Sequence, residues 1–440
     1  MAGLTDTARR LLSEPNIVHL ATVMPDGSPQ VSPIWAHVED GVIEFNTAAG
    51  RVKEQNMRRD PRVAFSVVNR DDPYERACVR GRVVEMVEGD EARAHIDKMA
   101  KKYLGSDTYP WYKGAKPGSS SGSSPSRAQL LSQTFVYLSR HEVANLMPPV
   151  GEQLDLVEET YRAVGAGRVE LPPKPGIHPR PDSFIHAMPA YLRDGDVAAL
   201  KWVAGYPANK ERGLPYITGL IVLNDPETGM PAAIMDGAEI TAARTAAASG
   251  VCIRRFAPED WSRAAVLGAG EQGRFHAQVL RELNPEVAIR AWDPHPERIG
   301  SLGDRVEAAP GPREAVEEAD VVVTAGPIVE EPESPLTPDW LAERSLGLPI
   351  DFDFYFSADA VASAELFLVD DVSQFEYYRS LGHFQGWPEP EESVGEALSR
   401  DGSPTRVVCC NLGIGALDAA FAARVLAAAR DRGIGTELPL

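Results

Sequence analysis

At 440 residues the chain is too long for one ordinary hydrophobic core. With 43% hydrophobic and 25% charged residues, it has the composition of a globular protein with two or three domains. Its formal net charge of −20 opposes nonspecific binding to nucleic acids and to anionic membranes, so neither is an expected partner. An anionic cofactor remains compatible with this charge, because such cofactors bind to local clusters of basic residues.

The four cysteines have neither the spacing of metal ligands nor that of a disulfide framework, and no metal site is expected. Adjacent Cys409 and Cys410 lie in an apolar run and are expected to be buried thiols. The first residues contain no signal-peptide core, and no apolar run is long enough to span a bilayer. These features predict a cytoplasmic protein.

Residues 1–112 are predicted to form a small antiparallel barrel, because short strand-like runs alternate there with turn signals. The runs are 17–23, 30–38, 42–47, 63–68 and 77–86, with helices expected at 5–13 and 91–102.

A hydroxyl group and two cations, those of Thr47, Arg51 and Lys53, follow one of these strands closely. Such a group at a strand–helix junction suits a bound phosphate. A solvated basic face explains the same pattern equally well.

Several motifs of residues 1–112 resemble the pyridoxamine-phosphate-oxidase-like split barrels, in particular the branch that uses the deazaflavin coenzyme F420. The residues that carry the resemblance are 20–22, 25–29, 32–35, 46–53, Asn56 and 102–111. It implies a dimeric barrel that binds F420 or FMN at the dimer interface. It also implies that Thr47, Arg51 and Lys53 meet the phosphate, while Ser32 and Trp35 line the ring pocket.

Residues 113–130 are predicted to be a linker, because they are rich in Gly, Ser and Pro and have few apolar side chains to offset the entropy of ordering. The F420-using branch has a further strand at this place. Its apparent absence predicts an incomplete barrel.

Two cations further along the chain lie in apolar surroundings, Lys201 within Ala-Leu-Lys-Trp-Val and Arg244 within Ala-Ala-Arg-Thr-Ala-Ala. A buried charge without a partner is very costly, so each cation is expected to have one. One interpretation is an internal salt bridge or a side chain that reaches the surface. The other is a clamp for a substrate carboxylate, in which Arg244 binds in bidentate fashion and Lys201 adds a charge or relays a proton.

An apolar run at 264–267 ends in the motif Gly-x-Gly-x-x-Gly, formed by Gly268, Gly270 and Gly273, and a helix-prone segment follows. Glycines at these positions permit a tight turn and close approach of the backbone to a pyrophosphate, which the helix N-terminus also attracts. Asp293 follows the next predicted strand, about 20 residues on, where an acid can bind a ribose 2′-hydroxyl. The motif predicts a dinucleotide site that favours NAD over NADP, because Asp293 would repel a 2′-phosphate.

Two later apolar runs end in polar residues. Thr324 ends a run whose carboxyl end is expected at the cofactor crevice, and Asp351 and Asp353 follow another. An acid there can act as a base or orient an amine, although an exposed loop acid is equally compatible with the pattern.

From about residue 135 to the end, the chain resembles the ornithine cyclodeaminase/mu-crystallin family. The resemblance rests on Lys174, 188–190, 201–203, Asn209, 236–237, 241–247, 268–273, 413–415 and Asp418. The family implies a homodimer with a split substrate domain and a Rossmann domain. Its members oxidise a 2-amino acid or reduce an imine with NAD(P).

The resemblance also implies roles for individual residues. The substrate-binding residues are Lys174, His186, Met188, Lys201 and Arg244, and the catalytic ones are Lys201 with Asp351 or Asp353. The cofactor-binding residues are Gly268, Gly270, Glu271, Gln272, Gly273, Asp293, Thr324 and Gly413. Lys174 stands where cyclodeaminases have an arginine, and His186 where they have an acid. These differences argue against ornithine cyclisation and leave hydride chemistry at a C–N bond.

The expected architecture is therefore multidomain: an antiparallel split β-barrel, an α+β substrate and dimerisation domain (131–257 and 405–440), and an α/β Rossmann domain (258–404). The predicted function is that of a two-module oxidoreductase, in which the C-terminal module uses NAD(P) on an amino or cyclic imino acid and the N-terminal module binds F420 or FMN. Two alternatives are a non-catalytic ligand-binding protein of mu-crystallin type and an F420-dependent reductase whose C-terminal part is mainly structural.

Overall fold

The computed structural model describes residues 6–39, 42–48, 50–87, 90–111, 123–130, 134–329, 331–402 and 404–439. These residues fall into two compact units, Met1–Thr134 with Glu437–Leu440, and Phe135–Thr436. None of the helices in the described ranges is long and apolar enough to cross a membrane.

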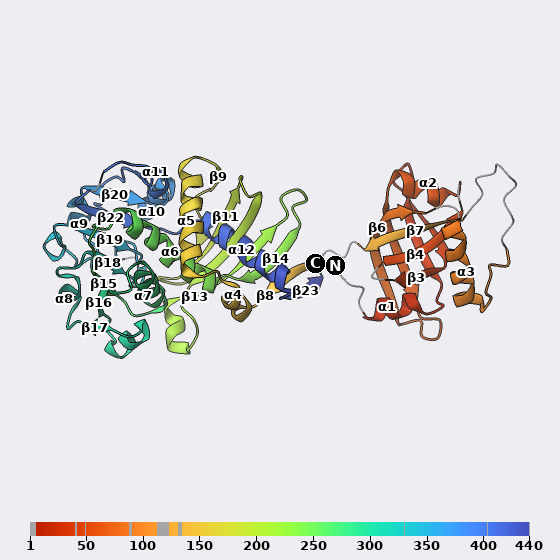
Figure 1. Cartoon of the computed structure of the whole chain (residues 1–440), viewed down its shortest axis with the longest axis horizontal. Coiled ribbons are helices and arrows are strands. Elements are labelled where there is room, and N and C mark those ends of the chain that lie inside the picture. The colour runs from red at the N-terminus through yellow and green to blue at the C-terminus, as the bar shows by residue number, and fades with distance from the viewer. Residues whose placement is uncertain are drawn as a thin grey trace. The chain divides into compact units, whose positions relative to one another are not determined.

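The first unit is built on a seven-stranded sheet in which all neighbouring strands are antiparallel (Figure 1). The strand order is β2-β1-β5-β6-β7-β4-β3. Its core contains Leu20, Phe45 and Phe65. The predicted antiparallel pairing is present, and closure of the sheet into a split barrel stays a prediction. The elements are α1 (Asp6–Ser13), β1 (Val18–Val23), β2 (Pro29–Ile34), β3 (Ala36–Glu39), β4 (Val42–Ala48), α2 (Val52–Arg59), β5 (Arg62–Val68), β6 (Arg76–Met86), α3 (Asp90–Leu104) and β7 (Ser123–Leu130).

The prediction of a linker at 113–130 is wrong for its second half. Residues 113–122 lie outside the described residues, but Ser123–Leu130 forms β7, which pairs with β4 on one side and with β6 on the other. A strand between two others satisfies its backbone groups along both edges. The linker was predicted from the lack of apolar side chains alone. That composition carries no information about backbone pairing with strands far away in the sequence. The expectation of a missing strand is corrected by the same observation.

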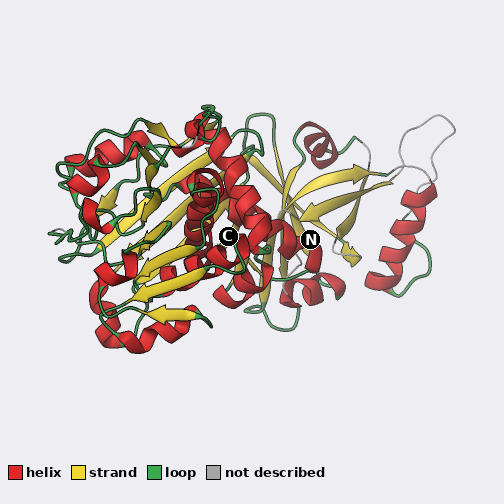
Figure 2. Ribbon diagram, turned by 60° about the vertical axis from the view of Figure 1, so that its left-hand side comes forward, coloured by secondary structure: helices red, strands yellow, loops and turns green. Residues whose placement is uncertain are grey.

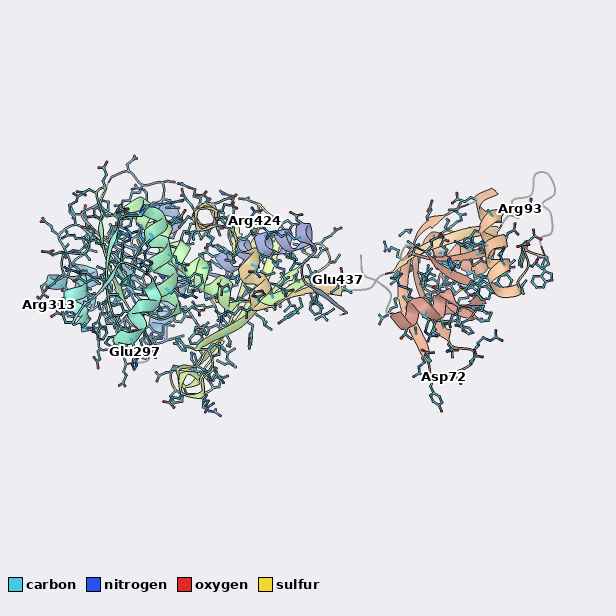
Figure 3. All side chains as sticks on the ribbon, turned by 60° about the horizontal axis from the view of Figure 1, so that its bottom comes forward. Asp72, Arg93, Glu297, Arg313, Arg424 and Glu437 are labelled. Atoms are coloured by element: carbon cyan, nitrogen blue, oxygen red, sulfur yellow. The ribbon has the colours of Figure 1, made fainter. Side chains whose placement is uncertain are left out.

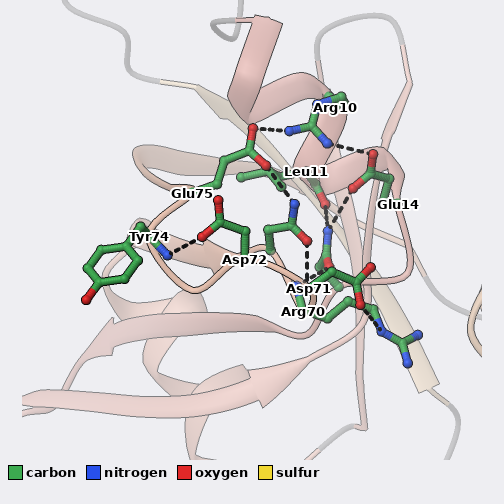
Figure 4. A network of polar contacts seen from close by, with 10 residues as sticks. Arg10, Leu11, Glu14, Arg70, Asp71, Asp72, Tyr74 and Glu75 are labelled. Atoms are coloured by element: carbon green, nitrogen blue, oxygen red, sulfur yellow. Dashed lines mark hydrogen bonds and ion pairs between the residues drawn. The ribbon is translucent and has the colours of Figure 1, made fainter.

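A polar network holds α1 against the turn between β5 and β6 (Figure 4). Arg10 pairs with Glu14 and with Glu75. The amide of Asn16 donates to the Leu11 carbonyl at 3.0 Å, and its oxygen accepts from the backbone N–H of Arg70 at 3.1 Å. The helix is thereby fixed by its polar end as well as by its buried leucines.

The second unit contains a largely antiparallel sheet with the path β10-β11-β12-β13-β14-β8. β13 (Ile217–Asn224) and β14 (Pro231–Asp236) form a hairpin and pair antiparallel. β8 (Thr134–Leu138) pairs parallel with β14. The remaining strands of this part are β9 (Val169–Glu170), β10 (Gly176–Ile177), β11 (Phe184–Leu192) and β12 (Val197–Gly205), and β23 (Thr436–Pro439) is the last strand of the chain.

The second sheet of this unit is entirely parallel, in the order β17-β16-β15-β18-β19-β22-β20-β21. Both of its faces are covered, as Figure 2 shows by helices on either side. Val266 of β15 belongs to one core and its neighbours Ala265 and Leu267 to another. The strands are β15 (Arg263–Leu267), β16 (Ala288–Trp292), β17 (Val306–Ala308), β18 (Val321–Thr324), β19 (Ser345–Pro349), β20 (Leu366–Val369), β21 (Glu392–Ser393) and β22 (Arg406–Cys410).

The predicted end of the Rossmann domain at residue 404 is too early, because β22 lies inside the parallel sheet between β19 and β20. Cys409 and Cys410 of this strand are fully buried free thiols, as predicted. An apolar run fits a strand of either domain, so composition could not assign it to one.

Helices α6 and α12 join the two parts of this unit, and one hydrophobic core runs through both. α12 packs against β11 and β12, which confirms its predicted return to the substrate domain. Ser139 caps α4 in a capping box with Glu142. The helices are α4 (Arg140–Leu146), α5 (Val150–Gly165), η1 (Pro207–Arg212), α6 (Ala238–Phe256), α7 (Glu271–Leu283), η2 (Pro296–Leu302), α8 (Pro312–Val316), η3 (Pro338–Trp340), α9 (Ala358–Ala362), α10 (Val372–Ser380), α11 (Val394–Ala397) and α12 (Gly415–Arg432).

Candidate functional site

One buried carboxylate, that of Asp418 in α12, pairs with both of the cations expected to need a partner. The Lys201 ammonium lies 2.8 Å from Asp418 Oδ2, and Arg244 Nε lies 3.1 Å from Asp418 Oδ1. Lys201 and Asp418 are each 1% exposed and Arg244 is 5% exposed. Most charged side chains instead lie at the surface, as Glu297, Arg313 and Arg424 do in Figure 3. The expectation of an ionic partner is therefore confirmed, and both cations share it.

Three elements bring these groups together for reasons visible in the chain. Side chains alternate along β12, so Lys201 faces the interior while its neighbour Trp202 faces outward. Arg244 is flanked by alanines on α6, which allow close packing around it. Asp418 lies in the first turn of α12, where the helix dipole favours a negative charge.

A second group of buried polar side chains, next to the Lys201–Asp418–Arg244 group, binds the backbone of Leu412 and Gly413. The Lys174 ammonium donates to the carbonyls of Leu412 and Gly413 at 2.7 and 3.2 Å. The Asp370 carboxylate accepts from the N–H groups of the same two residues at 3.0 and 2.7 Å. Gly413 has a φ of +82°, and a Cβ there would lie 2.6 Å from Arg244. Glycine is thus required at 413 by both conformation and space.

Burial shifts the pKa values of these groups towards neutrality. It lowers the pKa of Lys174 to about 7 and that of Lys201 to about 8, in the second case with help from the neighbouring Arg244 charge. It raises the pKa of Asp370 to about 6. The sequence analysis missed Asp370, although the residue directly follows an apolar run, the same pattern that singled out Asp351.

A cavity of about 470 Å³ in the second unit is lined by Lys174, Lys201 and Arg244. Four more of the predicted site residues reach it, namely His186, Met188, Gln272 and Gly413. Ala325 and Gly326, at the carboxyl end of β18, form part of its wall. The structure therefore brings the expected substrate residues to the edge of the parallel sheet where a dinucleotide binds in such folds.

The predicted catalytic acids, Asp351 and Asp353, do not line this cavity. Asp351 accepts from the Thr324 hydroxyl at 2.6 Å and from the Gly326 N–H at 2.7 Å, and burial raises its pKa to about 7. Asp353 accepts from the Phe384 N–H at 2.7 Å. Both carboxylates hold neighbouring loops in place. The hydroxyl of Thr324 donates its hydrogen bond to Asp351. Catalytic roles for the two acids stay predictions.

The glycine-rich turn has the geometry that the motif predicts. Gly268 has a φ of +108° and packs so closely on Ala325 that a Cβ would lie 2.5 Å from its carbonyl oxygen. A Cβ on Gly273 would lie 2.0 Å from the Gly268 oxygen, whereas one on Gly270 would meet nothing within 4 Å. The open space at Gly270, at the start of α7, is where a phosphate could approach the backbone.

Two acids support this turn. Asp293 accepts from the backbone N–H of Ala269 at 2.8 Å through Oδ2 and from that of His295 at 2.8 Å through Oδ1. Glu271 pairs with Arg140 of α4. Asp293 thus orders the turn, and its predicted contact with a ribose stays a prediction.

In the first unit, the structure places the three predicted phosphate residues around the start of α2. The hydroxyl of Thr47 is buried, and no described residue forms a hydrogen bond with it. The ammonium of Lys53 lies 3.2 Å from the hydroxyl of Ser32, and burial lowers its pKa. Arg51 is exposed at the N-cap of α2. Trp35 stacks on Tyr103 with the ring centroids 5.1 Å apart.

The model of the ornithine cyclodeaminase/mu-crystallin family matches residues 134–345. The nodulation efficiency protein NfeD of Rhizobium meliloti is 37% identical over 314 residues, which cover 68% of this chain and 97% of that protein. The chain belongs to the ornithine cyclodeaminase/mu-crystallin family. The model of pyridoxamine 5′-phosphate oxidase matches residues 4–132, so a domain of that type precedes the family domain and includes β7.

The solved structures that match the second part of the chain include two enzymes with a bound nicotinamide cofactor. Δ1-pyrroline-2-carboxylate reductase of Thermococcus litoralis, in complex with NADH and L-proline, is 26% identical with a TM-score of 0.62, over 69% of this chain and 100% of that chain. An archaeal alanine dehydrogenase, a dimer with bound NAD, is 26% identical with a TM-score of 0.62, over 70% of this chain and 99% of that chain. NAD(H) is therefore bound in both structural neighbours.

The lowered pKa of Lys174 predicts how stability changes with pH. Between about pH 7 and the ordinary value of 10.5, the unfolded chain binds more protons at this residue than the folded chain does, so folding gains stability as the pH rises. Relative to Lys174→Met, the wild type should gain up to about 1.4 kcal/mol of unfolding free energy per pH unit in this window. Urea unfolding of both proteins across the window measures the difference, and a constant difference would contradict the prediction.

Proposed function

We propose that the unit Phe135–Thr436 is an NAD(H)-dependent oxidoreductase that interconverts an imine and an amine at the α-carbon of an amino acid or a cyclic imino acid. The observation that carries the proposal is the buried Lys201–Asp418–Arg244 group on a cavity that also reaches Gln272 and Gly326. A carboxylate-binding group and a dinucleotide-binding loop thus share one cavity.

The residues around the glycine motif fit a dinucleotide. Gly268 and Gly273 make the compact turn, Gly270 leaves space for a pyrophosphate, and the first turn of α7 provides free N–H groups. Asp293 places a carboxylate beside this turn, which favours NAD over NADP because a 2′-phosphate would be repelled. When bound, the nicotinamide supplies or accepts the hydride.

Arg244 and Lys201 have separate tasks in this proposal. Arg244 donates from Nε to Asp418, and its two terminal nitrogens can bind a substrate carboxylate in bidentate fashion. The Lys201 Nζ, with a pKa of about 8, is charged near neutral pH and can still release a proton. Asp418 holds this nitrogen in place. Reduction of an imine needs a proton as well as a hydride, and Lys201 is the group suited to deliver it.

The enzymes that the second unit resembles support the proposed class of reaction. The structural neighbours include a reductase of a cyclic imino acid with NADH and L-proline and an alanine dehydrogenase with NAD. The second is described as a dimer, which supports the expectation of a homodimer here.

Gly270→Ala should weaken NADH binding without affecting the fold. An added methyl group meets no atom within 4 Å in the protein, and the φ of −82° suits alanine, but the methyl would stand where the pyrophosphate approaches. The dissociation constant, measured by NADH fluorescence, should rise about tenfold or more, equivalent to about 1.4 kcal/mol. Gly195→Ala, in the turn after β11, should leave it unchanged. NADH affinity that is equal in the two variants would exclude the proposed phosphate position.

Lys201→Met should lower kcat/KM for a cyclic imino acid by about 10²- to 10⁴-fold, because proton delivery is lost. The measurement is NADH consumption followed by absorbance, with Lys98→Met, an exposed lysine of the first unit, as the control. Undiminished turnover by Lys201→Met would remove the residue from the mechanism. No NADH consumption by the wild type, across a panel of cyclic imines and 2-oxo acids with ammonia, would favour a non-catalytic ligand-binding protein instead.

We further propose that the first unit binds a phosphate-bearing flavin or deazaflavin, FMN or F420, through Thr47, Arg51 and Lys53. The specific observation is the buried Thr47 hydroxyl without a partner, close in sequence to a buried lysine and an exposed arginine at a helix start. The family match over residues 4–132 supports a domain of this type.

Lys53→Met should reduce the amount of FMN or F420 retained after gel filtration about tenfold, because a buried charge–phosphate contact is lost. The retained cofactor is quantified by its visible absorbance, with Lys98→Met as the control. Failure of the wild type to retain either cofactor would refute the proposal.

A further inference from the structure

A continuous wall of ring side chains lines one part of the cavity in the second unit. The rings of Phe184 and His186 stack with centroids 4.4 Å apart, and His186 lies 6.2 Å from Tyr378. Phe352 lies 5.0 Å from Tyr378 and 5.4 Å from His383. All five residues line the cavity. We refer to these five rings as the aromatic wall.

The aromatic wall is built from separate segments that the structure holds firmly. Phe352 follows β19 with a φ of +61°, a conformation that is costly for a bulky residue. It is held there from both sides, because Asp351 accepts from Thr324 and Gly326 while Asp353 accepts from the Phe384 N–H. The two acids that the sequence singled out thus position a ring of the cavity.

The layer that faces the cavity is richer in polar rings than the layer behind it. Behind Phe352 and Tyr378 lie Phe375, Phe384 and Trp387, with Phe375 and Phe384 stacked 4.8 Å apart, and of these three only Trp387 has a polar ring atom. A hydrophobic core alone would not need imidazole and phenol groups in its outer layer. Their placement indicates a surface for a planar ligand that also forms hydrogen bonds.

The hydroxyl of Tyr378 is the group of the aromatic wall that points most directly to a ligand. The residue is 3% exposed, and among the residues that the structure describes its hydroxyl oxygen has no hydrogen-bond partner. A buried hydroxyl without a partner costs free energy, so a partner from a ligand would stabilise it. Burial also lowers the pKa of the adjacent His186 to about 3, so that this imidazole is neutral and offers hydrogen bonds without a charge.

The basic side chains of the cavity can receive a carboxylate. Lys174, Lys201 and Arg244 line the cavity, as does one acid, Asp182. Lys201 and Arg244 are both paired with Asp418, and the Lys174 ammonium lies 5.0 Å from the centre of the Tyr378 ring. A ligand carboxylate at these cations and a ligand ring on the aromatic wall can thus occupy the same cavity.

We propose that the substrate is a 2-imino or 2-amino acid whose side chain is an aromatic ring with a hydrogen-bonding substituent, seated on the aromatic wall and bonded to the Tyr378 hydroxyl. The assignment rests on the proposed function, because it places the carboxylate at Arg244 and Lys201. In the reductive direction the C=N carbon gains a hydride from NADH and the nitrogen gains a proton, which gives the amine and NAD⁺.

The first test measures binding to the full-length protein with NADH present, by calorimetry, and needs no turnover. The ligands are propionate, 3-phenylpropionate and 3-(4-hydroxyphenyl)propionate, which share one carboxylate and differ in the ring and its hydroxyl group. The two ring compounds should bind at least about tenfold more tightly than propionate, and the hydroxylated one most tightly. Equal affinity for all three would overturn the proposal.

The second test uses Tyr378→Phe, which keeps the ring and removes only the hydroxyl group. The preference for the hydroxylated over the unsubstituted ring compound should fall about tenfold, while Tyr377→Phe, the next residue on the same helix and outside the cavity lining, should keep it. An unchanged preference in Tyr378→Phe would remove that hydroxyl from the site and overturn the proposal.

A kinetic panel separates this inference from the proposed function. NADH consumption is compared for ammonia with pyruvate, phenylpyruvate and 4-hydroxyphenylpyruvate. Faster turnover of the aromatic acids, measured as kcat/KM, supports the aromatic class. Preferred turnover of pyruvate would leave the proposed function intact and overturn the aromatic class. If no compound is turned over, the proposed function fails, and the binding measurements still decide whether the aromatic wall receives a ring.

Discussion

The interior of the second unit depends on one carboxylate that serves two cations. Asp418 is almost inaccessible to solvent and lies within ion-pair distance of both Lys201 and Arg244. Removing one member of such a buried group leaves an uncompensated charge, which typically costs about 3–5 kcal/mol. The three elements that carry these residues, β12, α6 and α12, are therefore held together at the cavity by electrostatics as well as by packing.

The need to pair buried charged groups also shapes the neighbouring backbone of Leu412 and Gly413. Lys174 binds its carbonyls, Asp370 binds its N–H groups, and Gly413 gives Arg244 the space it occupies. Lys201 and Arg244 can stay charged away from solvent because Asp418 pairs with both of them, and two cations on one carboxylate can still attract a second carboxylate. The aromatic wall then provides the ring-lined part of the same cavity.

Much of the fold could be predicted because it rests on local patterns. The glycine motif, the hairpin of β13 and β14 and the capping box at Ser139 are each specified by residues close together in the sequence. The strand β7 could not be predicted in this way. Its Ser-rich composition indicates a linker, and only pairing with β4 and β6 makes it a strand.

The sequence by itself determined which chemical groups the protein has: a glycine-rich loop around Gly268, two cations in apolar runs, and a hydroxyl group with two cations near Thr47. It also required that Lys201 and Arg244 have partners, because an unpaired buried charge is too costly. Only the tertiary structure decided that Asp418 is the partner of both, and that Asp351 and Asp353 hold loops at the cavity and do not line it. The physical reason is that ion pairs and ring contacts join residues far apart in the chain, whereas sequence patterns report on neighbours.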